Sequence, residues 1–160
     1  MAPYHSFQDG PNGWYRGLSR DAKGVVQVRY PGQIGLQYNI VTIAQYGIVC
    51  YDAYAKTQKN EYRETFFAQV EYIMDGGEEL ELINGVARYR ALFPVPERNL
   101  PAGTVGAMGQ GLVTSLLLRA HHLTGDNSYL QRAGESIRCM VKYIEDGGAR
   151  THSPLFDFWV

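Results

Sequence analysis

Two polar connectors decide the fold of this chain: Thr57-Gln58-Lys59-Asn60-Glu61-Tyr62 and Thr124-Gly125-Asp126-Asn127-Ser128-Tyr129. Thr, Asn and Tyr recur in them at one offset, 124 minus 57, or 67 residues. Each connector separates two stretches whose apolar residues follow the spacing of a helix with one buried face. The repeat therefore predicts two helical hairpins, each turning at one connector.

Apolar side chains follow helical spacing on both sides of each connector. The residues that carry this pattern in the first hairpin are Ile40, Ile43, Ala44, Gly47, Ile48, Tyr51, Tyr54 and Ala55, then Tyr62, Phe66, Val70 and Ile73. In the second hairpin they are Val113, Leu116, Leu117 and Ala120, then Tyr129, Ala133, Ile137, Met140, Val141 and Ile144. We predict helices over residues 39–58, 60–75, 106–123 and 127–145.

Residues with capping preferences stand at the ends of these helices. Asn60 and Asp126 are well placed as N-caps of the second helix of each hairpin. Gly76-Gly77 and Gly147-Gly148 are expected to end the same two helices, since glycine adopts the left-handed conformation that often follows a last turn.

The segment between the hairpins reads as a β-hairpin. Residues 79–83 and 86–93 alternate in polarity, and Asn84-Gly85 between them is the strongest two-residue hairpin signal. Arg88 and Arg90 would project from one face of the second strand, where paired guanidinium groups suit carboxylate or sulfate recognition. A solvated hairpin face is the other interpretation of the two arginines.

A hairpin repeat of this length, with an irregular segment between the units, predicts a mainly α fold: a partial α/α toroid of antiparallel helical hairpins with a small β-hairpin on its rim. An ordinary helical bundle is the alternative, but the connection over 76–103 is long for a bundle. We expect residues 1–160 to form one domain. Residues 1–30 would be an N-terminal arm with a short strand over 25–28, and residues 31–160 would be the N-terminal half of an incomplete toroid.

Composition sets the outer limits. Hydrophobic residues make up 45% of the 160, enough for one core, and 15 basic against 16 acidic residues give a formal charge of −1. This balance gives no field for nucleic acid or an anionic membrane. We expect no membrane span and no signal peptide in the first thirty residues. Cys50 and Cys139 fall on apolar sides of helices and are expected to be core residues.

Most standard catalytic motifs are absent from the sequence. It has no nucleophile-elbow serine, P-loop or dinucleotide fingerprint, and His121-His122, expected at a helix end, are adjacent and cannot share one helical face for a metal. The chain does hold 12 tyrosines. Most are expected to serve packing, although tyrosine also suits sugar stacking and, with a lowered pKa, proton transfer.

Two separated motifs resemble one family. The segment Tyr38-Asn39-Ile40-Val41-Thr42-Ile43-Ala44-Gln45-Tyr46-Gly47 resembles the Y-P-x-x-I-A-Q-Y-G signature of D-glucuronyl C5-epimerases. Ala107-Met108-Gly109-Gln110-Gly111, with Ser115 to Ala120 and Leu123 to Asp126, resembles their A-M-A-Q-G-x-x-x-S-x-L-x-R-A-x-x-L-T-x-D run. The likeness covers most of residues 30–148 and is closest to compact bacterial-type members.

The resemblance implies an enzyme that inverts C5 of glucuronate in a heparosan-like chain, giving iduronate by proton removal and return, without a cofactor or a metal. The implied partner is a uronic-acid-containing polysaccharide. The residues expected to contact it are Tyr38, Gln45, Tyr46, Arg88, Arg90 and Gln110. For the two glutamines, a structural role linking helix ends to the β-hairpin is an open alternative.

The family's catalytic tyrosines, the first in an E-E-Y-P run, would follow an aromatic segment like residues 156–160, where this sequence ends, so the catalytic residues are unknown and the chain is expected to be an inactive fragment. Gly109 and Leu112 also depart from the family's usual Ala and Gln. The aromatic run over 155–160 would expose apolar surface, and we expect the chain to form homo-oligomers through it.

Two rival functions stay open. One is an epimerase or glycoside-processing toroid acting on another uronic acid, such as those of alginate or pectin. The other belongs to a different class: a non-catalytic carbohydrate-binding or assembly module, closed by self-association.

Overall fold

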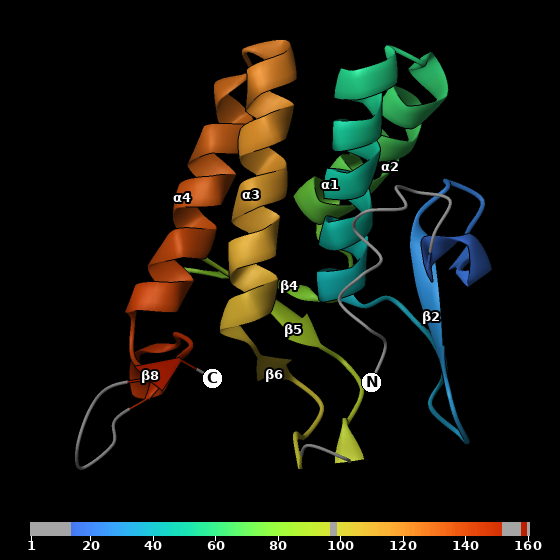
Figure 1. The fold of residues 1–160 in the computed structure, drawn as a ribbon. Helices are drawn as coiled ribbons and strands as arrows, with labels where there is room; N and C mark the ends of the chain where they lie inside the picture. Colours follow the sequence, from blue (N-terminus) through green and yellow to red (C-terminus); the bar gives the residue numbers. More distant parts are fainter. Residues whose placement is uncertain (1–13, 97–98, 152–157, 160) are drawn as a thin grey trace.

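Four helices in two antiparallel hairpins form the body of the molecule. The computed structural model describes residues 14–96, 99–151 and 158–159. The helices are α1 (Ile40–Thr57), α2 (Asn60–Asp75), α3 (Ala107–Thr124) and α4 (Asn127–Val141), which lie side by side in Figure 1. Both helices of the second hairpin begin 67 residues after those of the first, 107 minus 40 and 127 minus 60. The mainly helical fold and the repeat are confirmed.

The helix ends correct two predictions. Asp126 caps α4, with its carboxylate accepting from the N–H of Ser128, but Asn60 is the first residue of α2 and bonds Glu64 instead, since Lys59 occupies the cap position. α4 ends at Val141 rather than 145, because Lys142 is extended, and a separate 3₁₀ turn, Ile144–Asp146, precedes Gly147. Gly147-Gly148 therefore follow this turn and do not end α4.

The buried face of α4 also differs from the predicted stripe. Ala133, Ser136 and Cys139 are its buried residues, whereas Ile137, Val141 and Ile144 are exposed. The polar Ser136 can be buried because its hydroxyl bonds Gln110 of α3. In α3, all four predicted core residues are fully buried, and eight of the twelve predicted in the first hairpin are buried, whereas Ala55 is exposed.

Close contact between α1 and α3 joins the two hairpins. A Cβ built at Gly47 of α1 would lie 2.5 Å from Cδ1 of Leu116 in α3 and 3.2 Å from Cβ of Gln69 in α2. The absence of a side chain at Gly47 is thus what allows three helices to meet at this point.

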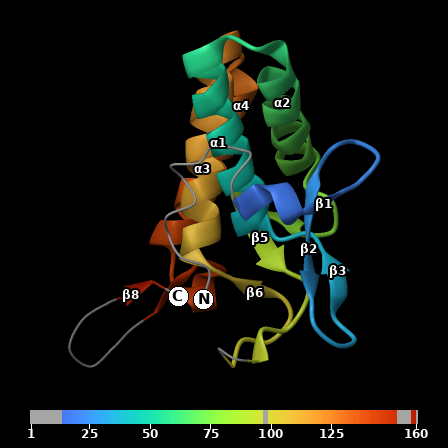
Figure 2. The ribbon, with the colours of Figure 1, turned by 45° about the vertical axis from the view of Figure 1, so that its right-hand side comes forward.

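A three-stranded sheet packs against the outer side of the first hairpin (Figure 2). Its strands are β1 (Ser19–Arg20), β2 (Val26–Tyr30) and β3 (Gly35–Gln37). Buried Gln69 of α2 links to it directly, accepting from the N–H of Val26 at 3.1 Å and donating to the carbonyl of Gly24 at 2.9 Å. The predicted strand over 25–28 is therefore present, although it covers residues 26–30. It pairs with β3, which lies after residue 30, so the sheet extends past the predicted end of the N-terminal arm.

The predicted β-hairpin is confirmed below the helices. β4 (Leu80–Ile83) pairs with β5 (Val86–Ala91), and Asn84 and Gly85 both have positive φ, as a tight hairpin turn requires. A third strand, β6 (Thr104–Val105), pairs with the far end of β5 just before α3 begins. This sheet lies beside the starting ends of α1 and α3 (Figure 1).

The end of the described chain forms β7 (Arg150–Thr151), which pairs with β8 (Phe158–Trp159). The rest of the aromatic run, including Phe156, lies outside the described residues.

Cys50 and Cys139 are buried free thiols, as expected. Within residues 14–96, 99–151 and 158–159, no helix is long and apolar enough to span a membrane. Two hairpins do not close a ring, so the toroid stays a prediction.

Because only the second repeat has a side-chain cap at this connector, alanine substitution is expected to lower stability unequally in the two repeats. Asp126→Ala removes a side-chain bond to an otherwise unpaired N–H of α4, whereas Asn60→Ala removes only an exposed contact with Glu64. We expect Asp126→Ala to lower the melting temperature measured by circular dichroism, and Asn60→Ala to change it much less. Equal losses would contradict the cap assignment.

Candidate functional site

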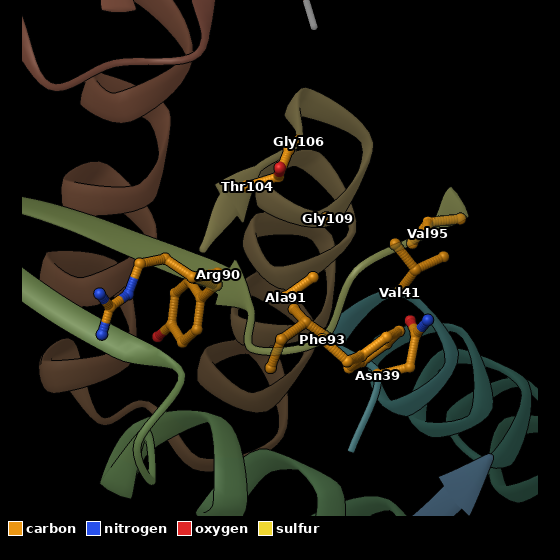
Figure 3. Close-up of a pocket in the computed structure, with 11 residues that line it drawn as sticks. Asn39, Val41, Arg90, Ala91, Phe93, Val95, Thr104, Gly106 and Gly109 are labelled. Carbon is orange, nitrogen blue, oxygen red and sulfur yellow. The ribbon is translucent and has the colours of Figure 1, made fainter. Parts of the chain in front are cut away.

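A cavity of about 150 Å³ opens where α1 and α3 begin and β5 ends. Figure 3 shows its walls: the start of α1, the chain from Tyr89 to Val95, and the start of α3. The residues lining it are Asn39, Ile40, Val41, Tyr89, Arg90, Ala91, Phe93, Val95, Thr104, Gly106 and Gly109. Ligand pockets usually measure about 300–1,000 Å³, so this one suits a single sugar substituent or ring.

The start of α3 contributes Gly106 and Gly109 to the wall of this cavity. Its cap residue is Gly106, which has no side chain to accept from the first turn, and the N–H groups of residues 107–109 have no partner among the described residues. Unpaired N–H groups at a helix start carry partial positive charge and bind anions. At the start of α1, in contrast, the side-chain oxygen of Asn39 accepts from the N–H of Thr42, and its side-chain nitrogen donates to the Tyr30 hydroxyl.

Arg88 and Arg90 lie on one face of β5, as predicted, but both bind Glu81 on β4. The Arg88–Glu81 distance is 2.6 Å and the Arg90–Glu81 distance is 4.0 Å. Arg90 also donates to the carbonyl of Glu78 at 3.1 Å, so its guanidinium points away from the cavity while its stem lines it (Figure 3). Because one carboxylate serves two guanidinium groups, the cluster retains about one positive charge on the hairpin surface.

The two motif glutamines occupy different environments. Gln110 is fully buried; its amide donates to the carbonyl of Tyr89 at 2.9 Å, and its oxygen accepts from Ser136 at 3.1 Å. All of its described partners are in β5 and α4, so it links α3 to the β-hairpin. Gln45 is partly exposed, and its side chain has no partner in the described part of the chain.

Tyr38 belongs to a closed network of two tyrosine–carboxylate pairs. Its hydroxyl donates to Asp21 at 2.9 Å, the Tyr72 hydroxyl donates to buried Glu79 at 2.7 Å, and the two rings are 4.7 Å apart. Burial, then the nearby Asp21, raises the pKa of Tyr38 to about 12, and burial with Glu79 raises the pKa of Tyr72 further. Both hydroxyls therefore stay protonated at neutral pH and act as donors rather than bases.

Tyr46 is buried and is bonded within the protein. Its hydroxyl accepts from Arg20 at 2.5 Å, and its ring lies 5.3 Å from that of Tyr15. Burial raises the pKa values of Tyr46 and of the neighbouring Cys50 thiol, the latter to about 12. These groups are uncharged at neutral pH and link the N-terminal segment to α1.

Of the six predicted contact residues, the structure brings only Arg90 to the cavity. Asn39, Phe93 and Gly106 line it and were not predicted, because they come from three segments far apart in the sequence. One signal was available: Gly106, rather than Ser, Thr, Asp or Asn, stands at the start of the predicted helix over 106–123. His121 and His122 lie in the last turn of α3, and the described residues hold no group of three or more side chains suited to a metal.

Comparison with known proteins assigns the second half of the chain. Residues 83–159 match the family model described as D-glucuronyl C5-epimerase C-terminus. This segment supplies eight of the eleven residues that line the cavity. No curated protein and no solved structure matches the chain.

Proposed function

The chain belongs, over residues 83–159, to the D-glucuronyl C5-epimerase family, and from this premise we propose that it binds a glucuronate unit of a heparosan-like polysaccharide for C5 epimerisation. The observation that supports the proposal is the uncapped start of α3, which opens into a cavity inside the matched segment. The carboxylate of the sugar would accept hydrogen bonds from the N–H groups of residues 107–109 there.

Carboxylate binding is what this reaction requires. Removing the C5 proton leaves an electron pair that is delocalised onto the adjacent carboxylate, and a proton then returns to C5 on the opposite face. The intermediate is stabilised by donors placed where that charge develops, and the N-terminus of a helix supplies such donors without reorganisation. In this proposal, the start of α3 supplies donors of this kind to the carboxylate.

Among the described residues, none that lines this cavity is placed to move the proton. Its titratable residues are Tyr89 and Arg90; the Tyr89 hydroxyl donates to the carbonyl of Ile73, and burial raises its pKa. The Arg90 guanidinium lies on the Glu81 side. We therefore propose that this chain binds the uronate without exchanging its C5 proton.

Calorimetric titration with two matched ligands tests the binding. We expect a heparosan oligosaccharide to bind, and its carboxyl-reduced form, in which glucose replaces glucuronate, to bind at least about tenfold more weakly, since a charge-assisted hydrogen bond contributes roughly 1.5–3 kcal/mol. Gly109→Leu should abolish binding, because a side chain there extends towards Ile40 and Val41 into the cavity. Gly111→Val, on the other side of α3, is the control and should bind normally.

Equal binding of both ligands would overturn carboxylate recognition. Tighter binding of alginate or pectin oligosaccharides than of heparosan would assign a different uronate.

A non-catalytic carbohydrate-binding module is the second candidate, favoured by the absence of an acid or base facing the cavity among the described residues. Both proposed functions predict that no deuterium is incorporated at C5 when this chain is incubated with heparosan in deuterated water. Deuterium incorporation, read by NMR, would show that a residue of this chain is a working base and would contradict both.

A further inference from the structure

Tyr30 of β2 contacts two cavity-lining residues that are far apart in the sequence. Its hydroxyl accepts a hydrogen bond from the side-chain nitrogen of Asn39 at 2.6 Å. Its ring centroid lies 4.5 Å from that of Phe93, with an angle of 43° between the two ring planes. Asn39 and Phe93 both line the cavity (Figure 3), whereas Tyr30 is not among its lining residues. One side chain of the N-terminal sheet therefore supports two parts of the cavity wall.

Two hydrogen bonds fix the orientation of the Asn39 side chain. Its oxygen accepts from the backbone N–H of Thr42 and so caps α1. Its nitrogen must then be at the other end of the amide, and one of the two hydrogens on that nitrogen goes to the Tyr30 hydroxyl. The second hydrogen has no partner among the residues that the structure describes, so it is available to a ligand in the cavity.

The residue before Asn39 is bonded to the N-terminal segment as well. Tyr38 donates to Asp21, which directly follows β1, so two consecutive residues at the start of α1 are held by side chains of that segment. Phe93 is 4% exposed, and the Tyr30 ring is one of the groups that cover it. Of these residues, only Phe93 belongs to the segment that matches the family model. The N-terminal sheet therefore takes part in shaping a cavity that lies mostly in the matched segment.

We propose that Tyr30 is a positioning residue of the uronate site: it holds the Asn39 amide so that one N–H remains for the ligand, and it keeps Phe93 in the wall. This inference rests on the proposed binding of a uronate in the cavity. A carboxylate has only acceptor oxygens, and a hydrogen bond to a charged group is stronger than one to a neutral group. Asn39 thus adds a side-chain donor to the backbone donors at the start of α3.

A double-substitution cycle tests whether Tyr30 acts through Asn39, with calorimetric titration of a heparosan oligosaccharide into the full chain. Tyr30→Phe removes only the hydroxyl, and we expect the affinity to fall by about three- to tenfold. Asn39→Ser keeps a capping side chain for α1 but has no amide, so the affinity should fall by at least as much. Adding Tyr30→Phe to Asn39→Ser should then change the affinity by less than about twofold, because the group that Tyr30 holds is already absent.

Nuclear magnetic resonance of the isotope-labelled chain tests the contact without a ligand. The side-chain amide signals of Asn39, identified by their loss in Asn39→Ser, should shift in Tyr30→Phe. Tyr62→Phe is the matched control, since it removes a hydroxyl from the first turn of α2, at the end of the first hairpin away from the cavity. It should change neither these signals nor the affinity. Circular dichroism checks that each variant folds.

Three results would overturn the proposal. The first is a Tyr30→Phe variant that melts at a lower temperature but binds heparosan like the wild type, which would make Tyr30 a structural residue only. The second is a double variant in which the two losses of affinity multiply, and the third is a set of Asn39 signals that stay in place in Tyr30→Phe. A wild type that does not bind heparosan would overturn the proposed function instead, and the Asn39 signals would then decide alone whether Tyr30 positions the amide.

Discussion

Gln110→Ala is expected to lower the free energy of unfolding by about 3 kcal/mol, from the sum of a lost buried hydrogen bond and an unfilled cavity. The amide is fully buried and is the described donor to the Tyr89 carbonyl, which would be left unpaired in the core. Ser136 keeps its second bond, to the backbone carbonyl of Gln110, so the loss falls mainly on the contact between α3 and β5. Urea unfolding followed by circular dichroism measures it.

Gln45→Ala is the matched control, because it removes the same side chain from the other motif at a partly exposed position. We expect its free energy of unfolding to change by less than about 1 kcal/mol, as is usual for surface substitutions. If Gln110→Ala unfolds like the wild type but loses heparosan affinity, then Gln110 binds ligand and the structural role assigned to it is wrong.

Gly47→Val is expected to destabilise the protein by about 2–4 kcal/mol, although valine forms helix better than glycine. The first added carbon alone would lie 2.5 Å from Leu116 and 3.2 Å from Gln69. Leu116 is fully buried, and Gln69 is held by its bonds to residues 24 and 26. The strain should therefore separate α1 from α3 and also disturb the sheet on the first hairpin. Thermal and urea unfolding measure the loss.

Gly111→Val is the control for this prediction. A Cβ there would meet only the flexible end of Met140, at 3.8 Å, and the corresponding residue of the first hairpin, Ala44, already has a methyl group. We expect a change within about 1 kcal/mol. Equal destabilisation by both variants would mean that helix geometry, rather than the contact with Leu116, makes Gly47 necessary.

The helices and the β-hairpin were predictable because their signals are local. Periodic apolar residues, the two connectors and Asn84-Gly85 each specify structure within a few residues of themselves. Asn60 misled because a good capping residue can stand one position inside the helix. The predicted buried face of α4 was wrong because Ile137 and Val141 fit the helical spacing of apolar residues but lie on the exposed side. Ser136 is buried through its bonds to residue 110, and the sequence of α4 alone does not indicate those bonds.

The candidate site was less predictable because its geometry is made by distant segments. The likeness of two motifs indicated the family, and the match over residues 83–159 supports it. The same likeness suggested Tyr46 and Gln110 as ligand contacts, yet both are occupied inside the protein. The cavity arises where residues 39, 93 and 106 converge, and no periodic pattern links those positions.

Tyr89 has a consequence for how the molecule unfolds. Its hydroxyl donates to the carbonyl of Ile73 in the first hairpin, and its own carbonyl accepts from Gln110 in the second. Hairpins of a linear repeat usually open one at a time, since each contacts only its neighbour. Here Tyr89 is bonded to both hairpins. Detaching the first would leave the Tyr89 hydroxyl and the Ile73 carbonyl without each other, and detaching the second would do the same to the Tyr89 carbonyl and the Gln110 amide. The two repeats therefore behave as a single cooperative unit rather than as two separable modules.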